Sequence, residues 1–341
     1  MATTLAYPEA FEMQQIAQEM IADLTLDDVI FKYMPIVRRN VSKLLIRQLD
    51  NFTGMQQARG LDGEPASISK IGFNTYESIP GVYGEFGEIN ETELTTRAPI
   101  DNMMGTMDIT GLVMPIQNQL MARFVNRVRN LLWSALQGAL SVMGPNGAIV
   151  HTDTYTPRSY AAGVSWSDPV GSTPLQDLRN LTYFEEGSSS SFGTDAVIYL
   201  NRRTANNLIA NRNPADLFGR RTQGLGTFNS LNQINELFMA DGLPNVAIYN
   251  KSYFDDTAAH AFHYHIPTGV GIAIGQRPSN APIGEYQIVR NANNPNMEAD
   301  FYMQIINNIG KSAPPARVQV HCGHNGGPVL LFGTAVVNMA L

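Results

Sequence analysis

The sequence has little cysteine, few charges and no long apolar run. Its 341 residues include one cysteine, Cys322, so no disulfide can form within a single chain. No apolar stretch approaches the roughly 20 residues that a membrane helix needs. The N-terminal segment has neither the basic start nor the apolar stretch of a signal peptide. We therefore expect a protein that is made inside the cell and has no membrane contact.

Charged residues make up 16% of the chain, which is below the roughly 25% of an average protein. Apolar residues make up 44%, enough for a sizeable core. Because charge keeps soluble monomers apart, a chain with few charges is expected to turn much of its surface toward other protein. The net charge of −7 provides no overall positive field for nucleic acid or an anionic membrane.

The most regular pattern lies between Pro115 and Met143, where apolar residues recur every three or four positions. This spacing predicts one long helix, which Gly144–Pro145 would end. At 1.5 Å per residue it would be roughly 43 Å long. Upstream, residues 8–40 predict two shorter helices in succession.

After the long helix the chain alternates between strands and helices. Residues 193–213 predict a strand and then a helix with Asn201 as its N-cap. Residues 228–256 predict a helix, a turn at Gly242–Pro244 and a strand. Further strands are expected within residues 268–278, 284–291, 317–323 and 327–341. This order predicts an α+β fold with a projecting arm.

Residues 66–101 predict a long two-stranded hairpin that turns at Pro80–Gly81. Its glycines thin out the side chains that would build a core, and an isolated two-stranded ribbon is marginal in water. We therefore expect residues 66–98 to lie on a neighbouring copy of the protein. The side chains predicted to make this contact are Ile71, Phe73, Tyr76, Tyr83 and Phe86.

The densest basic patch contains Arg38, Arg39, Lys43 and Arg47. One interpretation is a solvated helix face. The other is a surface turned toward nucleic acid.

A cluster of histidines in "AHAFHYHIP" raises the question of a metal site. On an extended chain, His263 and His265 would point to one face and could offer two imidazoles to zinc or iron. The further candidate ligands are His260, His321, Cys322 and His324. No carboxylate follows the pair until Glu285, and the histidines alternate with aromatic residues as in an ordinary half-buried strand. We interpret them as structural, with a metal-dependent β-rich enzyme that uses His263 and His265 as the alternative.

Motifs for nucleotide binding and hydrolysis are missing. "GVGIAIG" has Ile274 where a dinucleotide loop needs its third glycine, and no P-loop, G-x-S-x-G or H-E-x-x-H occurs. We expect neither an enzyme nor a cofactor.

The order of these segments resembles that of the major capsid proteins of tailed bacteriophages, whose shell fold is named after phage Hong Kong 97. "ASISKIGFNTYESIPGVYGEFGEINETELTTRAP" resembles the extended loop of that family, and residues 112–143 resemble its spine helix. "AVIYLNRRTANNLIAN" and "LFMADGLPNVAIYNKSYFDD" resemble parts of its axial domain. The resemblance implies an N-terminal arm (1–50), an extended loop (51–110), a peripheral domain with the spine helix (111–165), an axial domain with returning strands (166–310) and C-terminal strands (311–341).

The resemblance also implies a function. The chain would self-assemble into hexamers and pentamers and form an icosahedral shell around double-stranded DNA. Portal and scaffolding proteins would be its partners, with a cement protein as a further candidate. It would be assembled in the host cytoplasm and end up in the virion. An encapsulin-type compartment shell, which shares the fold but holds cargo enzymes, is the nearest alternative.

Overall fold

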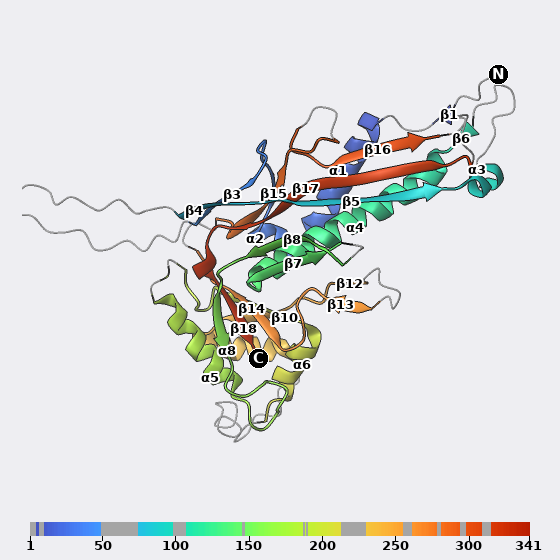
Figure 1. Cartoon of the computed structure of the whole chain (residues 1–341). Coiled ribbons are helices and arrows are strands. Elements are labelled where there is room, and N and C mark those ends of the chain that lie inside the picture. The colour runs from blue at the N-terminus through green and yellow to red at the C-terminus, as the bar shows by residue number, and fades with distance from the viewer. Residues whose placement is uncertain are drawn as a thin grey trace, which may run out of the picture.

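The computed structural model describes residues 5–6, 10–48, 74–97, 107–144, 147–186, 188, 190–212, 230–254, 261–277, 281–293, 298–308 and 315–341. These residues form an elongated peripheral domain and a rounder axial domain that contains the C-terminus (Figure 1). Within the described ranges, no helix is long and apolar enough to cross a membrane. The mixed architecture confirms the predicted α+β class.

The long helix α4 (Thr110–Leu136) is the spine of the peripheral domain. Its 27 residues give a length of about 40 Å. It ends seven residues before the predicted end, because Gly138 has a φ of 101° and the chain turns into β7 (Ala139–Met143). This strand pairs with β8 (Ile149–Thr154) in a hairpin. Its alternation of exposed and buried residues has the period of a strand, so the prediction of helix here was wrong.

A sheet lies against one side of α4 (Figure 1). Its central strand β17 (Val318–Leu330) joins what the sequence predicted as two strands. On one side β17 pairs with β16 (Tyr302–Asn307) and then β15 (Gly284–Val289), which pairs with β2 (Ile36–Arg38). On the other side it pairs with β5 (Gly81–Ile89) over all nine residues of that strand. Phe124 and Val128 of α4 belong to the core between helix and sheet.

The two predicted N-terminal helices are present as α1 (Ala10–Leu26) and α2 (Val29–Tyr33). Met13 and Ala17 of α1 are fully buried in the core that α4 shares. Gln117 of α4 donates a hydrogen bond to the backbone oxygen of Met13 at 2.9 Å. The N-terminal helices therefore belong to the body of the subunit.

The projecting ribbon differs from the predicted hairpin. Its strands are β3 (Leu44–Gln48) and β4 (Asn74–Ser78), which pair antiparallel and leave one end of the peripheral sheet (Figure 1). The chain continues from β4 into β5, so Pro80–Gly81 is not a hairpin turn. The helix α3 (Glu91–Arg97) follows β5, and β1 (Leu5–Ala6) pairs with β6 (Met107–Asp108).

The axial domain is built on a five-stranded sheet in the order β11, β10, β14, β18, β9. The strands are β9 (Arg158–Ala161), β10 (Val197–Leu200), β11 (Asn245–Ile248), β14 (Val270–Ile274) and β18 (Val336–Ala340). The helical elements are α5 (Pro174–Thr182), η1 (Tyr183–Glu185), α6 (Arg202–Ala210), α8 (Leu231–Ala240) and η2 (Gly333–Ala335). Asn201 caps α6 as predicted, accepting a hydrogen bond from the backbone nitrogen of Thr204 at 2.8 Å. A short ribbon, β12 (Ser252–Phe254) with β13 (Phe262–Tyr264), follows β11.

Candidate assembly surfaces

The extended ribbon is anchored at its base. Leu44 is fully buried against Val289 and Val329 of the peripheral sheet. Next to it, Lys43 pairs with Glu77 at 2.7 Å. The ribbon strands β3 and β4 are otherwise paired only with each other among the described strands. A two-stranded ribbon of this kind is marginal in water unless it lies on a further surface.

Four of the five residues predicted to contact a neighbouring subunit differ in where they lie. Tyr76 lies on β4 opposite Ile46 of β3, within the ribbon. Ile71 and Phe73 lie outside the described residues. Phe86 lies on β5, is 55% exposed and stacks on His321 with ring centroids 5.1 Å apart. A contact of Tyr76 or Phe86 with a neighbouring subunit stays a prediction.

Tyr83 makes its described contacts within its own subunit, and a contact of this residue with a neighbouring subunit stays a prediction. Its hydroxyl lies 2.6 Å from Nδ1 of His151, and its ring stacks on His324 at 5.2 Å. Burial raises the pKa of Tyr83, so the hydroxyl stays neutral. The second limb of the predicted ribbon is therefore part of the peripheral sheet.

The basic patch lies at the end of β2 and in the segment leading to β3, so the predicted helix face is wrong. Arg38 pairs with Asp300 at 3.1 Å, and Lys43 pairs with Glu77. Arg39 places its Nη2 3.0 Å from both carboxylate oxygens of Glu285. Arg47 lies on β3. Three of the four charges thus have an acidic partner within the subunit, and a role toward DNA stays a prediction.

The histidine cluster forms an aromatic group in the described structure. His263 is exposed and His265 is 2% exposed, and both rings approach Tyr253, at 5.6 and 5.1 Å. Burial lowers the pKa of His265 to about 3, and neither of its ring nitrogens has a hydrogen-bond partner among the described residues. His260 lies outside the described residues.

The second group of candidate ligands is divided between the two faces of β17. His321 stacks on the exposed Phe86, whereas Cys322 and His324 are buried. His324 shares a hydrogen bond of 2.8 Å with the hydroxyl of Tyr286. Burial raises the pKa of Cys322 to about 12, so the thiol is not a reactive thiolate. Within the described ranges, no three His, Cys, Asp or Glu side chains are grouped to hold a metal.

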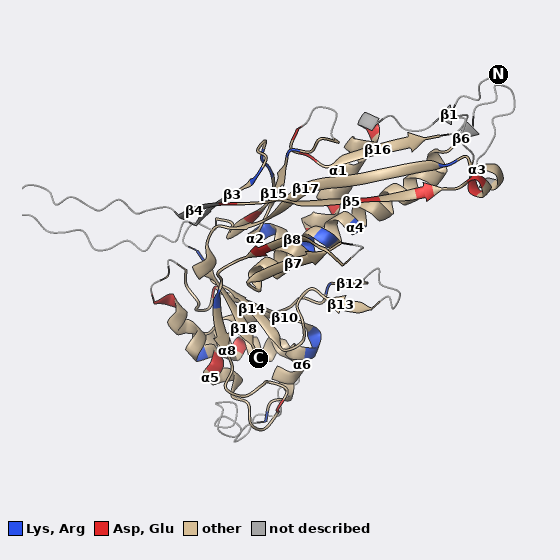
Figure 2. Cartoon of the chain, viewed as in Figure 1, with Lys and Arg blue, Asp and Glu red and all other residues tan. Residues whose placement is uncertain are grey.

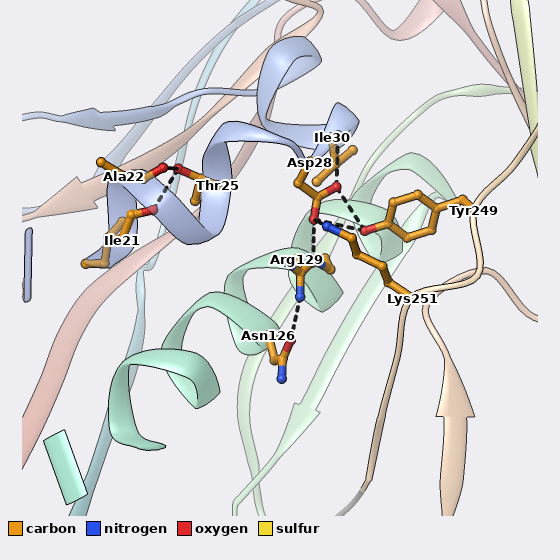
Figure 3. Close-up of polar contacts among 9 residues, drawn as sticks. All are labelled: Ile21, Ala22, Thr25, Asp28, Ile30, Asn126, Arg129, Tyr249 and Lys251. Atoms are coloured by element: carbon orange, nitrogen blue, oxygen red, sulfur yellow. Dashed lines mark hydrogen bonds and ion pairs between the residues drawn. The ribbon is translucent and has the colours of Figure 1, made fainter. Parts of the chain in front are cut away.

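A buried carboxylate that the sequence reasoning missed joins three parts of the subunit (Figure 3). Asp28, between α1 and α2, accepts hydrogen bonds from Arg129 of α4 and from Tyr249, and pairs with Lys251 at 3.0 Å. Burial would raise its pKa, but the two cations and their hydrogen bonds outweigh burial and lower it. The position of Asp28 before α2 is a capping signal that the sequence contains. Its partners Arg129, Tyr249 and Lys251 are far away in the sequence, so no pattern around Asp28 indicates that they bind it.

No protein-family model matches the chain, and neither does any curated protein. Solved structures match it in fold. One is a protein assigned as the capsid protein of a prophage of E. coli CFT073, with 13% identity and a TM-score of 0.53 over 95% of this chain and 98% of that one. Another is a phage-related protein from Bordetella bronchiseptica RB50, with 9% identity and a TM-score of 0.54 over 95% of each chain.

At these identities the likeness is one of fold. It extends over nearly the whole chain and so includes the spine helix, the peripheral sheet and the axial domain. The protein has the Hong Kong 97 shell fold of tailed-phage capsid proteins.

Proposed function

We propose that this protein is the major capsid protein of a tailed phage, which self-assembles into hexamers and pentamers and forms an icosahedral shell around double-stranded DNA. The observation that carries the proposal is the shell fold, matched over 95% of the chain by two phage proteins. The low charge of the sequence and the ribbon that leaves the body both favour a subunit that is completed by its neighbours.

In this proposal the peripheral sheet and α4 form the wall, and the ribbon reaches an adjacent subunit. Each contact between two subunits would have a modest affinity. A closed shell repeats the contact many times, and this multivalency stabilises the assembly. The net charge of −7 is compatible with a DNA-filled shell, because a closed wall confines the genome without specific binding. Portal and scaffolding proteins, and a cement protein, would be further partners, with assembly in the host cytoplasm and a final place in the virion.

A structural role fits the chemistry of the buried polar groups. Asp28, His324 and Tyr83 make their hydrogen bonds within the subunit, between elements that they hold together. We therefore propose a subunit without catalytic activity. The encapsulin alternative shares the fold, but the E. coli and Bordetella structures, with TM-scores of 0.53 and 0.54, are both phage-related.

The test is to express the full chain and examine it by sedimentation velocity and negative-stain microscopy, alone and with the scaffolding protein of its own phage. We expect closed spherical particles. A protein that stays monomeric under both conditions would contradict the proposal. Nuclease-protected double-stranded DNA in particles from the native source favours a phage shell, whereas a docked cargo enzyme and no DNA would favour a compartment shell.

A further inference from the structure

The ribbon formed by β12 and β13 carries an aromatic face that is largely exposed in the described part of the chain. Phe254 and Phe262 lie opposite each other across the two strands, with ring centroids 5.5 Å apart. The ring of Tyr264 lies edge-on to that of Phe262, with centroids 5.0 Å apart. Phe254 is 67% exposed and Phe262 is 49% exposed. A two-stranded ribbon with exposed aromatic rings is typical of a surface that is covered by a partner.

The opposite edge of the axial domain also exposes a large ring. Tyr183, at the start of η1, is 65% exposed. Arg158 of β9 donates a hydrogen bond to the backbone oxygen of Phe184, which holds η1 against this edge. In the five-stranded sheet β9 and β11 are the two outer strands, and the aromatic ribbon follows β11. The two patches therefore lie on opposite sides of the domain (Figure 1).

The charges around the two patches have opposite signs. Beside the ribbon, α6 begins with the exposed residues Arg202 and Arg203, and the backbone nitrogen of Arg202 donates to the side chain of Asn250, close to β12. Beside Tyr183, the exposed residues Glu185 and Glu186 follow directly. The cations at this edge have partners within the chain: Arg158 donates to the backbone oxygen of Phe184, and Arg179 pairs with Asp241. Figure 2 shows blue at α6 on one side of the axial domain and, on the other, red near the end of α5 together with blue on α5 itself. Complementary potentials of this kind favour the correct pairing of two surfaces and disfavour others.

We infer that these two edges dock head to tail in neighbouring copies of the chain, with the face of Phe254 and Phe262 covering the edge of Tyr183 in the next subunit. The inference rests on the proposed function, and it names the contact between subunits that would close the hexamers and pentamers of the shell. A contact between two different patches of the same chain is heterologous. It produces a closed ring when the rotation from one copy to the next is one turn divided by a whole number, such as five or six.

The test uses engineered cysteines, because the natural Cys322 is only 5% exposed. The chain carrying both Phe262→Cys and Tyr183→Cys is assembled into particles and treated with a short bismaleimide, which tolerates imperfect geometry. We expect a ladder of covalent oligomers on a denaturing gel that extends to pentamers and hexamers. Each single variant alone is expected to stay monomeric on the gel, and co-assembly of the two single variants is expected to add covalent dimers.

A matched control pairs Tyr183→Cys with Gln119→Cys, an exposed position on α4 in the other domain, and no ladder is expected from it. Intact particles in which the Phe262–Tyr183 double variant gives no ladder would overturn the inference and leave the proposed function standing. Dimers from Phe262→Cys alone would also overturn it, because they would indicate a symmetric contact. If the unmodified chain forms no particles, the proposed function itself fails.

Discussion

The guanidinium of Arg129 lies against the carboxylate of Asp28, with Nε and Oδ2 2.5 Å apart and both side chains almost fully buried. Arg129 comes from the spine helix and Asp28 from the junction of the N-terminal helices, while Tyr249 and Lys251 reach the same carboxylate from the axial domain (Figure 3). One buried charge thus connects the N-terminal helices, the spine helix and the axial domain.

Replacing Asp28 by Asn should destabilise the subunit by about 3–5 kcal/mol, because Arg129 is left buried without its counter-charge. The matched control is Asp27→Asn, at the exposed neighbouring position, for which a change within about 0.5 kcal/mol is expected. Urea unfolding of the unassembled subunit measures both. Equal stabilities of the two variants would show that the buried pair does not hold these parts together.

Stability should fall as the pH falls below about 6.5. Burial lowers the pKa of His265 and of His324 to about 3, and also lowers that of His151. In the unfolded chain histidine titrates near 6.5, so the unfolded state binds protons first on acidification. The stabilisation is complete above that pH and is lost as the pH falls toward 3. By pH 5 each of His265 and His324 should cost about 2 kcal/mol.

The measurement is the melting temperature of the unassembled subunit between pH 7.5 and pH 5. His324→Gln should flatten the pH dependence, because it removes one of the two buried histidines with the lowest pKa. A melting temperature that does not fall between pH 7 and pH 5 would contradict the assignment of buried neutral histidines.

Arg39 and Lys43 of the basic patch should differ in what they contribute to the stability of the subunit, because only the carboxylate that pairs with Arg39 is nearly buried. Arg39→Gln leaves the carboxylate of Glu285, which is 10% exposed, without its cation and should cost about 1–2 kcal/mol. Lys43→Gln breaks an exposed pair and should leave the stability of the subunit nearly unchanged. If the patch also faces DNA, neutralising Arg38, Arg39, Lys43 and Arg47 together should leave empty shells forming but reduce genome retention. Failure of empty shells to form would instead indicate a contact between subunits.

Much of the fold could be predicted because its signals are local. The period of α4, the cap at Asn201 and the order of strands and helices are all readable over a few turns of chain. The pairing of β5 with β17 joins residues far apart in the sequence, such as Gly81 and Gly326. Its alternation is blurred by Gly87, where a side chain would collide with Ile116 of α4. A buried strand thinned by glycine therefore has the sequence pattern of an exposed ribbon.

The Asp28 cluster could not be predicted for a related reason. Arg129 lies 101 residues from Asp28 and Tyr249 lies 221 residues from it. No spacing rule connects such positions, and only the packing of α1, α4 and β11 brings them together. The aromatic face of β12 and β13 includes part of "AHAFHYHIP", but the alternation of Phe262 and Tyr264 with histidines is equally typical of a half-buried strand.

Removal of the extended ribbon should separate folding from assembly. Replacing residues 46–76 by a short Gly-Ser turn keeps Leu44 in its buried site and leaves β5 paired with β17. The shortened subunit should melt close to the unassembled wild type, and it should fail to form closed particles on a sizing column. Closed shells from this variant would show that the ribbon is dispensable, and unfolded protein would show that it supports its own subunit.

A cryo-electron microscopy reconstruction of the particles is the decisive test of the proposed shell. We predict a closed icosahedral shell of hexamers and pentamers, in which the ribbon of β3 and β4 lies on an adjacent subunit and the axial domains meet around each ring axis. A discrete small oligomer as the final state, or a shell in which this ribbon contacts only its own subunit, would contradict it.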